Sequence, residues 1–150
     1  MDELFFRGVD YSLRLFPGLK KIIKKTGVVE LIGGITDGFL DEKGAMVIIS
    51  ERQNHNNIEM NPDYLALFER EVSQNVPGYR KIGLAMKEIK GISCGAIQYG
   101  MRYENKDVRS IMFIAVNRGK VIVISCTVSQ ELFDVYRPRF FELVESLEMI

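Results

Sequence analysis

The chain has 150 residues, 47% of them hydrophobic, and its 20 basic side chains balance 20 acidic ones. A chain of this length and apolar content can bury the core of about one domain, which argues against a disordered protein. Zero net charge gives no long-range attraction to polyphosphate, so we expect a single domain over residues 1–150 that binds no nucleic acid.

The N-terminus and the apolar runs bear on localisation. No apolar stretch approaches the roughly 20 residues that a membrane-spanning helix needs. The segment Met1–Arg7 lacks the basic and apolar regions of a secretory signal. Two cysteines do not make a disulfide framework. We therefore expect a cytoplasmic protein with no transmembrane segment.

Near the start of the chain, the segment Tyr11–Phe16 alternates between apolar and polar residues and then meets Pro17, which predicts a short strand closed by a turn. The next residues place apolar side chains on one side of a helical wheel, which predicts about two turns of helix. The opposite side carries four lysines: Lys20, Lys21, Lys24 and Lys25.

Two further strands are expected before the middle of the chain. The runs Val28–Ile35 and Ala45–Ser50 are apolar or β-branched, as is typical of strands. Residues 36–38 and 41–44 contain the Asp and Gly residues that favour turns. Residues 53–57 then form a polar loop that contains the single histidine, His55.

A helix is predicted from about Pro62 to Asn75. Asn61 is a good N-cap, and proline is favoured at the first helical position because no backbone N–H is needed there. Apolar residues recur at steps of three and four from Tyr64 to Val76, so one face of this helix should lie on a sheet.

From residue 79 the apolar period changes to two, which predicts four extended segments: Tyr79–Lys90, Ser93–Tyr103, Val108–Asn117 and Lys120–Val128. Short polar connections predict that the last three form an antiparallel meander. With Asn105-Lys106 and Arg118-Gly119 as two-residue loops, Gly100, Ile111 and Cys126 would lie side by side.

This register makes both faces of the meander apolar. One face carries Gln98 and Arg102 among the apolar residues Ala96, Ile111, Phe113, Ala115, Ile122 and Ile124. The other carries Ile97, Tyr99, Met101, Met112, Ile114, Val116, Val121 and Val123. A sheet that is apolar on both sides must be covered on both sides, and helices are the expected cover.

One covering helix is expected at the C-terminus. Ser129, or Thr127 with Gln130, could cap it, and its apolar stripe is Phe133, Tyr136, Phe140, Val144 and Leu147. Proline inside a helix removes a hydrogen bond and clashes with the preceding turn. We therefore expect Pro138 to cause a kink or to start a separate last helix near Arg137.

The order of these elements resembles the PsbP/DcrB-like superfamily, an α/β/α sandwich on a central antiparallel sheet. The resemblance runs from Tyr11 to Ile150 and rests on Tyr11–Pro17, the Asn61–Val76 helix, Ile89–Gly91 before a strand, the paired strands around Gly119-Lys120, and the closing Tyr136–Leu147 segment. It implies an α+β fold with helices on both faces, and mostly non-catalytic work with no transferable catalytic residues. Residues 26–44 also look similar to the first hairpin of a roadblock-like fold.

Two sequence patterns are candidates for catalysis. The segment Gly91-Ile92-Ser93-Cys94-Gly95 matches G-x-S-x-G, but a hydrolase needs a strand-to-helix turn at the serine and a histidine later in the chain. Ser93 is followed by a predicted strand, and His55 precedes it. His55 has no companion metal ligands at suitable spacing, so a solvated loop histidine is favoured.

The remaining candidates are the cysteines and the lysines. Cys94 and Cys126 lie two strands apart in the predicted meander, so we expect buried free thiols. Lys20, Lys21, Lys24 and Lys25 form a candidate surface for an anionic lipid or an acidic partner, against the more common solvated helix face.

The function predicted from the sequence is a non-catalytic protein-binding module, such as an adaptor, an assembly factor or a chaperone. Its partner is another protein, and a homodimer is a further candidate. We expect no catalytic residues, no metal and no cofactor. The alternatives are a small-molecule or lipid-surface binding protein that uses a cleft between sheet and helix, and a roadblock-like regulatory adaptor.

Overall fold

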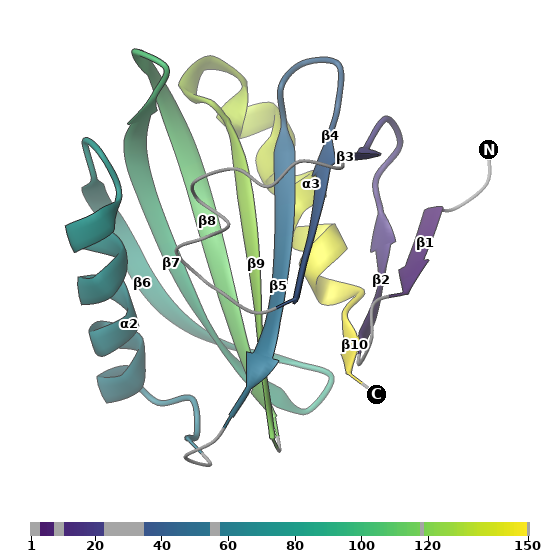
Figure 1. The fold of residues 1–150 in the computed structure, drawn as a ribbon, viewed down its shortest axis with the longest axis vertical. Coiled ribbons are helices and arrows are strands. Elements are labelled where there is room, and N and C mark those ends of the chain that lie inside the picture. Colours follow the sequence, from purple (N-terminus) through teal and green to yellow (C-terminus); the bar gives the residue numbers. More distant parts are fainter. Residues whose placement is uncertain (1–3, 8–10, 23–34, 55–57, 118, 150) are drawn as a thin grey trace.

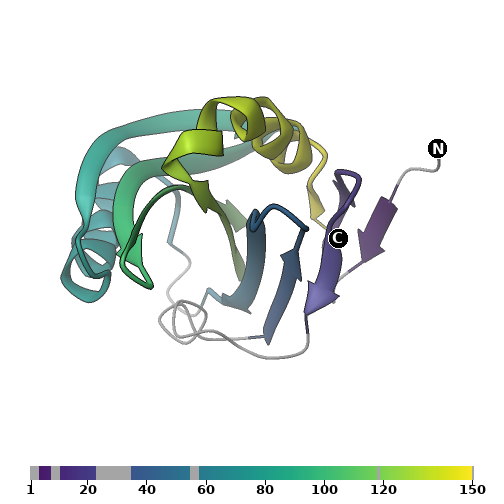
Figure 2. The same cartoon turned by 90° about the horizontal axis from the view of Figure 1, so that it is seen from above.

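The computed structural model of the chain describes residues 4–7, 11–22, 35–54, 58–117 and 119–149. The fold is built on one large antiparallel sheet, which curves strongly (Figures 1 and 2). Its seven strands, in spatial order, are β3 (Lys20–Ile22), β4 (Ile35–Leu40), β5 (Met46–Gln53), β9 (Lys120–Ser129), β8 (Lys106–Asn117), β7 (Ile92–Tyr103) and β6 (Arg80–Ile89).

A second, three-stranded sheet joins the two ends of the described chain. It contains β1 (Leu4–Arg7), β2 (Tyr11–Leu15) and β10 (Glu148–Met149), with β2 in the middle. The strand predicted at residues 11–16 is therefore confirmed as β2, whereas β1 and β10 were not predicted. Because both are short and β10 has only two residues, neither carries an alternating pattern long enough to detect.

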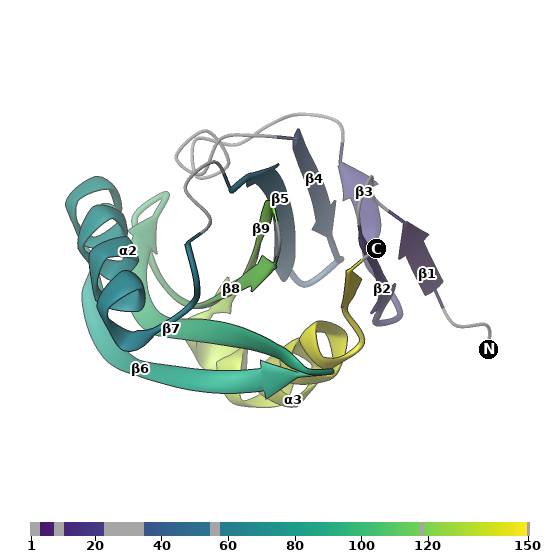
Figure 3. The ribbon, with the colours of Figure 1, turned by 90° about the horizontal axis from the view of Figure 1, so that it is seen from below.

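The described residues contain two α-helices. Helix α2 (Pro62–Asn75) begins as predicted, because the Asn61 side-chain oxygen accepts a hydrogen bond from the backbone N–H of Tyr64 at 2.8 Å. Helix α3 (Phe133–Glu145) follows a short 3₁₀ turn, η1 (Gln130–Leu132). Helix α2 lies at the β6 end of the molecule and the β1–β2 hairpin at the other (Figures 1 and 3).

The antiparallel meander β7–β8–β9 is confirmed, with one correction to its register. On the β8–β9 side the register is as predicted, because Asn117 pairs with Lys120 and Ile111 pairs with Cys126. The β7–β8 loop is at Glu104 and Asn105 rather than one residue later, so Ile111 pairs with Gln98 and not with Gly100. Both loop residues adopt positive φ, which asparagine tolerates well.

The two faces of the meander belong to different core clusters, and both are buried. Ile97, Met112 and Val123 pack with the apolar residues of α2. Ile111, Phe113 and Ile124 pack with α3 and also with Tyr11 and Leu13 of β2. The structure is thus a sheet-dominated α+β fold on an antiparallel sheet, as predicted. The prediction of helices as the cover of both faces is not confirmed, since strand β2 shares the cover of the second face.

The region before β5 contains two wrong predictions. Residues 20–22 form strand β3 rather than a helix, because they pair with residues 38–40 of β4. Residues 36–38 lie inside β4 rather than in a turn, because they pair with residues 48–50 of β5. The turn at Asp41–Gly44 is confirmed, and the Asp41 carboxylate accepts hydrogen bonds from the backbone N–H groups of Lys43 and Ala45. Residues 23–34, which contain most of the predicted 28–35 strand, lie outside the described residues.

The C-terminal helix is confirmed, but its start and its interior differ from expectation. Neither Ser129 nor Leu132, which precede η1 and α3, makes a side-chain capping bond. A separate helix near Arg137 is wrong, because α3 continues through the exposed Pro138. The five residues of the predicted apolar stripe are all buried. Their packing against the sheet outweighs the cost of the proline.

Candidate functional site

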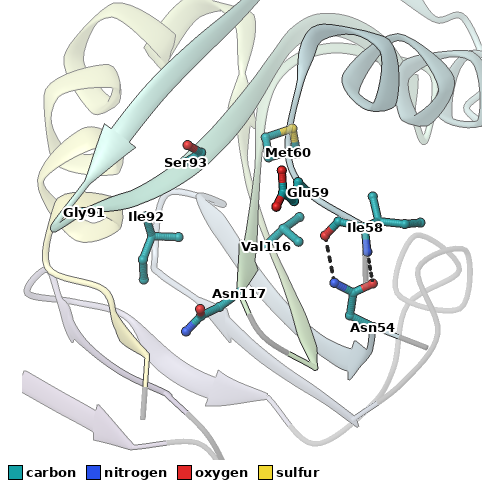
Figure 4. A pocket seen from close by; sticks show the side chains of 9 residues that line it. All are labelled: Asn54, Ile58, Glu59, Met60, Gly91, Ile92, Ser93, Val116 and Asn117. Atoms are coloured by element: carbon teal, nitrogen blue, oxygen red, sulfur yellow. Dashed lines mark hydrogen bonds between the residues drawn. The ribbon is translucent and has the colours of Figure 1, made fainter. Parts of the chain in front are cut away.

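The described part of the molecule contains an open cavity of about 470 Å³ where strands β7 and β8 diverge (Figure 4). The segment between β5 and α2 forms its remaining wall. Its lining residues come from three places in the sequence: Asn54, Ile58, Glu59 and Met60; Gly91, Ile92 and Ser93; and Val116 and Asn117.

The cavity exists because the β7–β8 ladder stops early. The last pair in this ladder is Cys94 with Ala115. Beyond it, Ser93 pairs only with Glu88 of β6, and Val116 pairs only with Val121 of β9. The two hairpins therefore separate at Ser93 and Val116, and the hollow opens between them.

The rim of the cavity is held by Asn54, which is 8% exposed. Its side-chain amide donates to the carbonyl of Ile58 and accepts from the N–H of Ile58, both at 2.9 Å. Its backbone N–H donates to the carbonyl of Gly119 at 2.8 Å, in the β8–β9 turn. The bond to Gly119 connects the segment before α2 to the β8–β9 hairpin. The two bonds to Ile58 occupy the amide N–H and C=O of the Asn54 side chain.

Glycine at position 95 lets the wall approach the sheet closely. A Cβ atom there would meet a methyl carbon of Leu65 at 2.6 Å and the sulfur of Met60 at 2.9 Å. Gly95 pairs with Met86 of β6, so the two methionines flank the same backbone position. Met60 is buried, whereas Met86 is 42% exposed.

Strand β6 is a second candidate site, because it forms one edge of the seven-stranded sheet and no described strand pairs with its outer side. It is ten residues long and carries two exposed large apolar side chains, Ile82 and Met86. The pairing with β7 is irregular at Ile82, between Lys81 and Gly83, and regular from Gly83 to Ile89.

The geometry around Ser93 agrees with a strand beginning and not with a nucleophile elbow. Ser93 is the second residue of β7 and is followed by ten more strand residues. The turn before it is formed by Lys90 and Gly91, both with positive φ, a conformation that glycine adopts readily. His55, the single histidine, lies outside the described residues. No histidine among the described residues therefore lies near Ser93.

Both cysteines are free and buried, as predicted. Burial raises the pKa of the Cys94 thiol to about 11, and the nearby Lys87 ammonium opposes this shift. Burial also raises the pKa of Cys126 strongly. Neither sulfur lines the cavity, so the two thiols belong to the core.

The structure places two of the four predicted surface lysines. Lys20 and Lys21 are exposed on β3. The ammonium of Lys21 lies 3.3 Å from the Asp37 carboxylate and 5.4 Å from the centre of the Phe6 ring. Lys24 and Lys25 lie outside the described residues. The anionic-partner surface at these lysines therefore stays a prediction.

The described residues offer neither a metal site nor a membrane-spanning helix. Within the described ranges, no three His, Cys, Asp or Glu side chains gather closely enough to hold a metal ion. In the same part of the chain, no helix is long and apolar enough to cross a bilayer.

Sequence reasoning did not find the cavity. Its polar residues come from three separate segments, and only the early end of the β7–β8 ladder brings them together. The signals that were available, the Gly91-Ile92-Ser93 segment and the polar loop at residues 53–57, point to two of these segments but not to their contact.

No protein-family model and no curated protein sequence matches the chain. Solved structures do resemble it. A protein of unknown function from Pseudomonas aeruginosa, PA94, described as a candidate regulator, has a TM-score of 0.68 at 15% identity, with 99% of this chain and 97% of that chain covered.

Two other solved structures are similar over most of their length. PsbP from the cyanobacterium Synechocystis has a TM-score of 0.65 at 17% identity, covering 94% of this chain and 87% of that one. LpqN of Mycobacterium tuberculosis, which is involved in cell envelope biogenesis, has a TM-score of 0.67 at 11% identity, covering 99% and 90%. The chain therefore has the PsbP-like fold that its sequence resembles.

Proposed function

We propose that this chain with a PsbP-like fold is a single-domain, non-catalytic module that binds another protein through the outer side of strand β6. The observation that carries the proposal is a ten-residue edge strand without a described strand on its outer side. An edge of this kind can accept an extended segment of a partner as an additional strand.

The backbone of β6 offers hydrogen-bonding groups at alternate residues. Ile89 and Ile92 close the β6–β7 hairpin, so their backbone groups bond to each other. Counting back in steps of two, Lys87 and Ala85 also face β7. The backbone N–H and C=O groups of Leu84, Met86 and Glu88 therefore face outward, where a partner strand would bind.

The side chains of β6 also suit a partner. Ile82 is 45% and Met86 42% exposed, and methionine adapts its shape to different partners. Edge strands are often protected by lysines and bulges, and β6 has both near Lys81. Lys87, however, lies 3.6 Å from Glu145 and 4.9 Å from the Phe141 ring on α3, which holds it away from the outer side.

A matched pair of variants at Glu88 tests this proposal. Glu88→Pro removes an outward N–H without removing a bond to β7, whereas Glu88→Ala changes the side chain and keeps the N–H. Each tagged variant is expressed in the source cells, and the proteins that co-purify are quantified against the tag alone.

We expect a partner that co-purifies with the unchanged chain and with Glu88→Ala and falls about tenfold with Glu88→Pro, since strand addition rests on such bonds. Circular dichroism checks that each variant is folded. Equal recovery with both variants would contradict strand addition at β6.

A second copy of the chain is one candidate partner, because its own β6 strand could pair with this one in a homodimer. Size-exclusion chromatography with light scattering distinguishes a second copy of the chain from a different protein as the partner. A dimer that becomes a monomer in Glu88→Pro identifies the second copy as the partner. A monomer in both proteins means that the partner is a different protein.

The compartment stays a prediction. The sequence predicts the cytoplasm, whereas LpqN, one of the similar structures, is involved in cell envelope biogenesis. Fractionation of the source cells, with detection of the untagged chain, decides between the cytoplasm and the envelope.

A further inference from the structure

The cavity between the two hairpins has an unusual backbone feature. In an antiparallel ladder, hydrogen-bonded pairs alternate with pairs that exchange no backbone bonds. The pair that closes the β7–β8 hairpin is Tyr103 with Lys106. Counting in steps of two from that pair reaches Gly95 with Ile114, and the next hydrogen-bonded pair would be Ser93 with Val116.

That next pair is not formed, although both residues line the cavity. The β6–β7 and β8–β9 ladders give the same direction for the backbone N–H and C=O groups of Ser93 and Val116. Ile89 with Ile92 and Asn117 with Lys120 close the flanking hairpins, so Ser93 and Val116 do not direct their backbone groups toward β6 or β9. Backbone hydrogen-bonding capacity of both residues is therefore directed into the gap between the strands.

The side chains around this gap combine polar groups with a smaller apolar surface. Met60, Ile92 and Val116 supply the apolar surface, and the polar groups include the Ser93 hydroxyl, the Asn117 amide and the Glu59 carboxylate (Figure 4). Clefts that hold small molecules have volumes of about 300–1,000 Å³. The cavity of about 470 Å³ lies in that range.

We propose that this cavity binds a small neutral amide with an apolar substituent. An amide carries the donor and the acceptor that a strand backbone offers, so it can take the place of the missing backbone pair at Ser93 and Val116. The apolar substituent would contact Met60 and Ile92. This site is separate from the outer side of β6, and its occupant is a small molecule, so the two proposals stand or fall independently.

Two probes of nearly the same shape test the amide. N-isopentylacetamide contains the amide N–H, and isopentyl acetate has an ester oxygen in its place. Each is titrated into the full ¹⁵N-labelled chain while backbone amide shifts are recorded. We expect saturable shifts at Ser93 and Val116 with the amide, and about tenfold weaker binding of the ester, as for the loss of one well-placed hydrogen bond.

Two variants on the same strand locate the site. Ser93→Trp fills the cavity and should abolish the shifts, whereas Tyr103→Trp, at the opposite end of β7, should leave them unchanged. The proposal is overturned by equal affinity for the two probes, by saturable shifts that persist in Ser93→Trp, or by no saturable binding of either probe.

Discussion

At the scale of single residues, Gly95 shows how closely the wall of the cavity approaches the sheet. Replacing it with alanine would place a Cβ atom 2.6 Å from Leu65 and 2.9 Å from Met60. We expect Gly95→Ala to lower the free energy of unfolding by about 1–3 kcal/mol, because overpacking forces neighbouring side chains to shift. Urea denaturation measures the difference.

Gly83→Ala is the matched control, since a Cβ atom at Gly83 has no heavy atom within 4 Å. It lies on the neighbouring strand and should change the unfolding free energy by less than about 0.5 kcal/mol. If the two variants are equally stable, the close approach of Met60 and Leu65 to Gly95 is wrong.

The two thiols are the second residue-scale prediction. Burial raises the pKa of Cys94 to about 11 and that of Cys126 further, so at pH 8 both remain protonated and enclosed. Ellman's reagent should detect neither thiol within minutes in the native protein, and both after denaturation. Rapid native reaction of either cysteine would contradict its place in the core.

At the scale of elements, helix α3 tolerates a proline that local rules disfavour. Pro138 lies in the sixth position of the helix and offers no N–H to the carbonyl of Asp134, four residues earlier. We expect Pro138→Ala to raise the free energy of unfolding by roughly 1–3 kcal/mol, after allowance for the more flexible unfolded chain.

Val135→Ala, at an exposed site on the same helix, is the control for helix propensity. It should raise the free energy of unfolding by only about 0.5 kcal/mol, because alanine has the higher helix propensity. A stability gain at Pro138→Ala no larger than at Val135→Ala would show that the proline costs nothing in this helix.

The long periodic elements could be predicted from the sequence, and the short ones could not. Helix α2 and strands β7–β9 each carry several apolar residues at one period, so their type is unambiguous. Strand β3 has three residues, and its Lys-Lys-Ile pattern fits a helix equally well. Only its pairing with β4 makes it a strand, and that contact is not encoded locally.

The register error shows how a local error can leave the core prediction intact. Placing the β7–β8 loop one residue late shifts each pair by two residues, and side chains alternate between faces with a period of two. Ile97 and Ile111 therefore stay on the faces predicted for them. The early end of the ladder at Cys94, which creates the cavity, has no such periodic signal.

At the scale of the whole molecule, the apolar meander needs cover on two sides, and the cover differs between them. Helix α2 packs on one side, and α3 with strand β2 packs on the other. These layers leave β6 at the edge of the sheet, with Met86 exposed beside the buried Met60. The proposed protein-binding function depends on the accessibility of that edge.

Backbone amide hydrogen exchange of the purified chain tests this accessibility most directly, residue by residue along β6. We expect an alternation in the free protein: the amides of Leu84, Met86 and Glu88 exchange quickly, while those of Ala85, Lys87 and Ile89 are protected by bonds to β7. In a sample that light scattering shows to be monomeric, slow exchange at Leu84, Met86 and Glu88 would mean that the outer side of β6 is already covered within the chain, and would contradict the proposed binding edge.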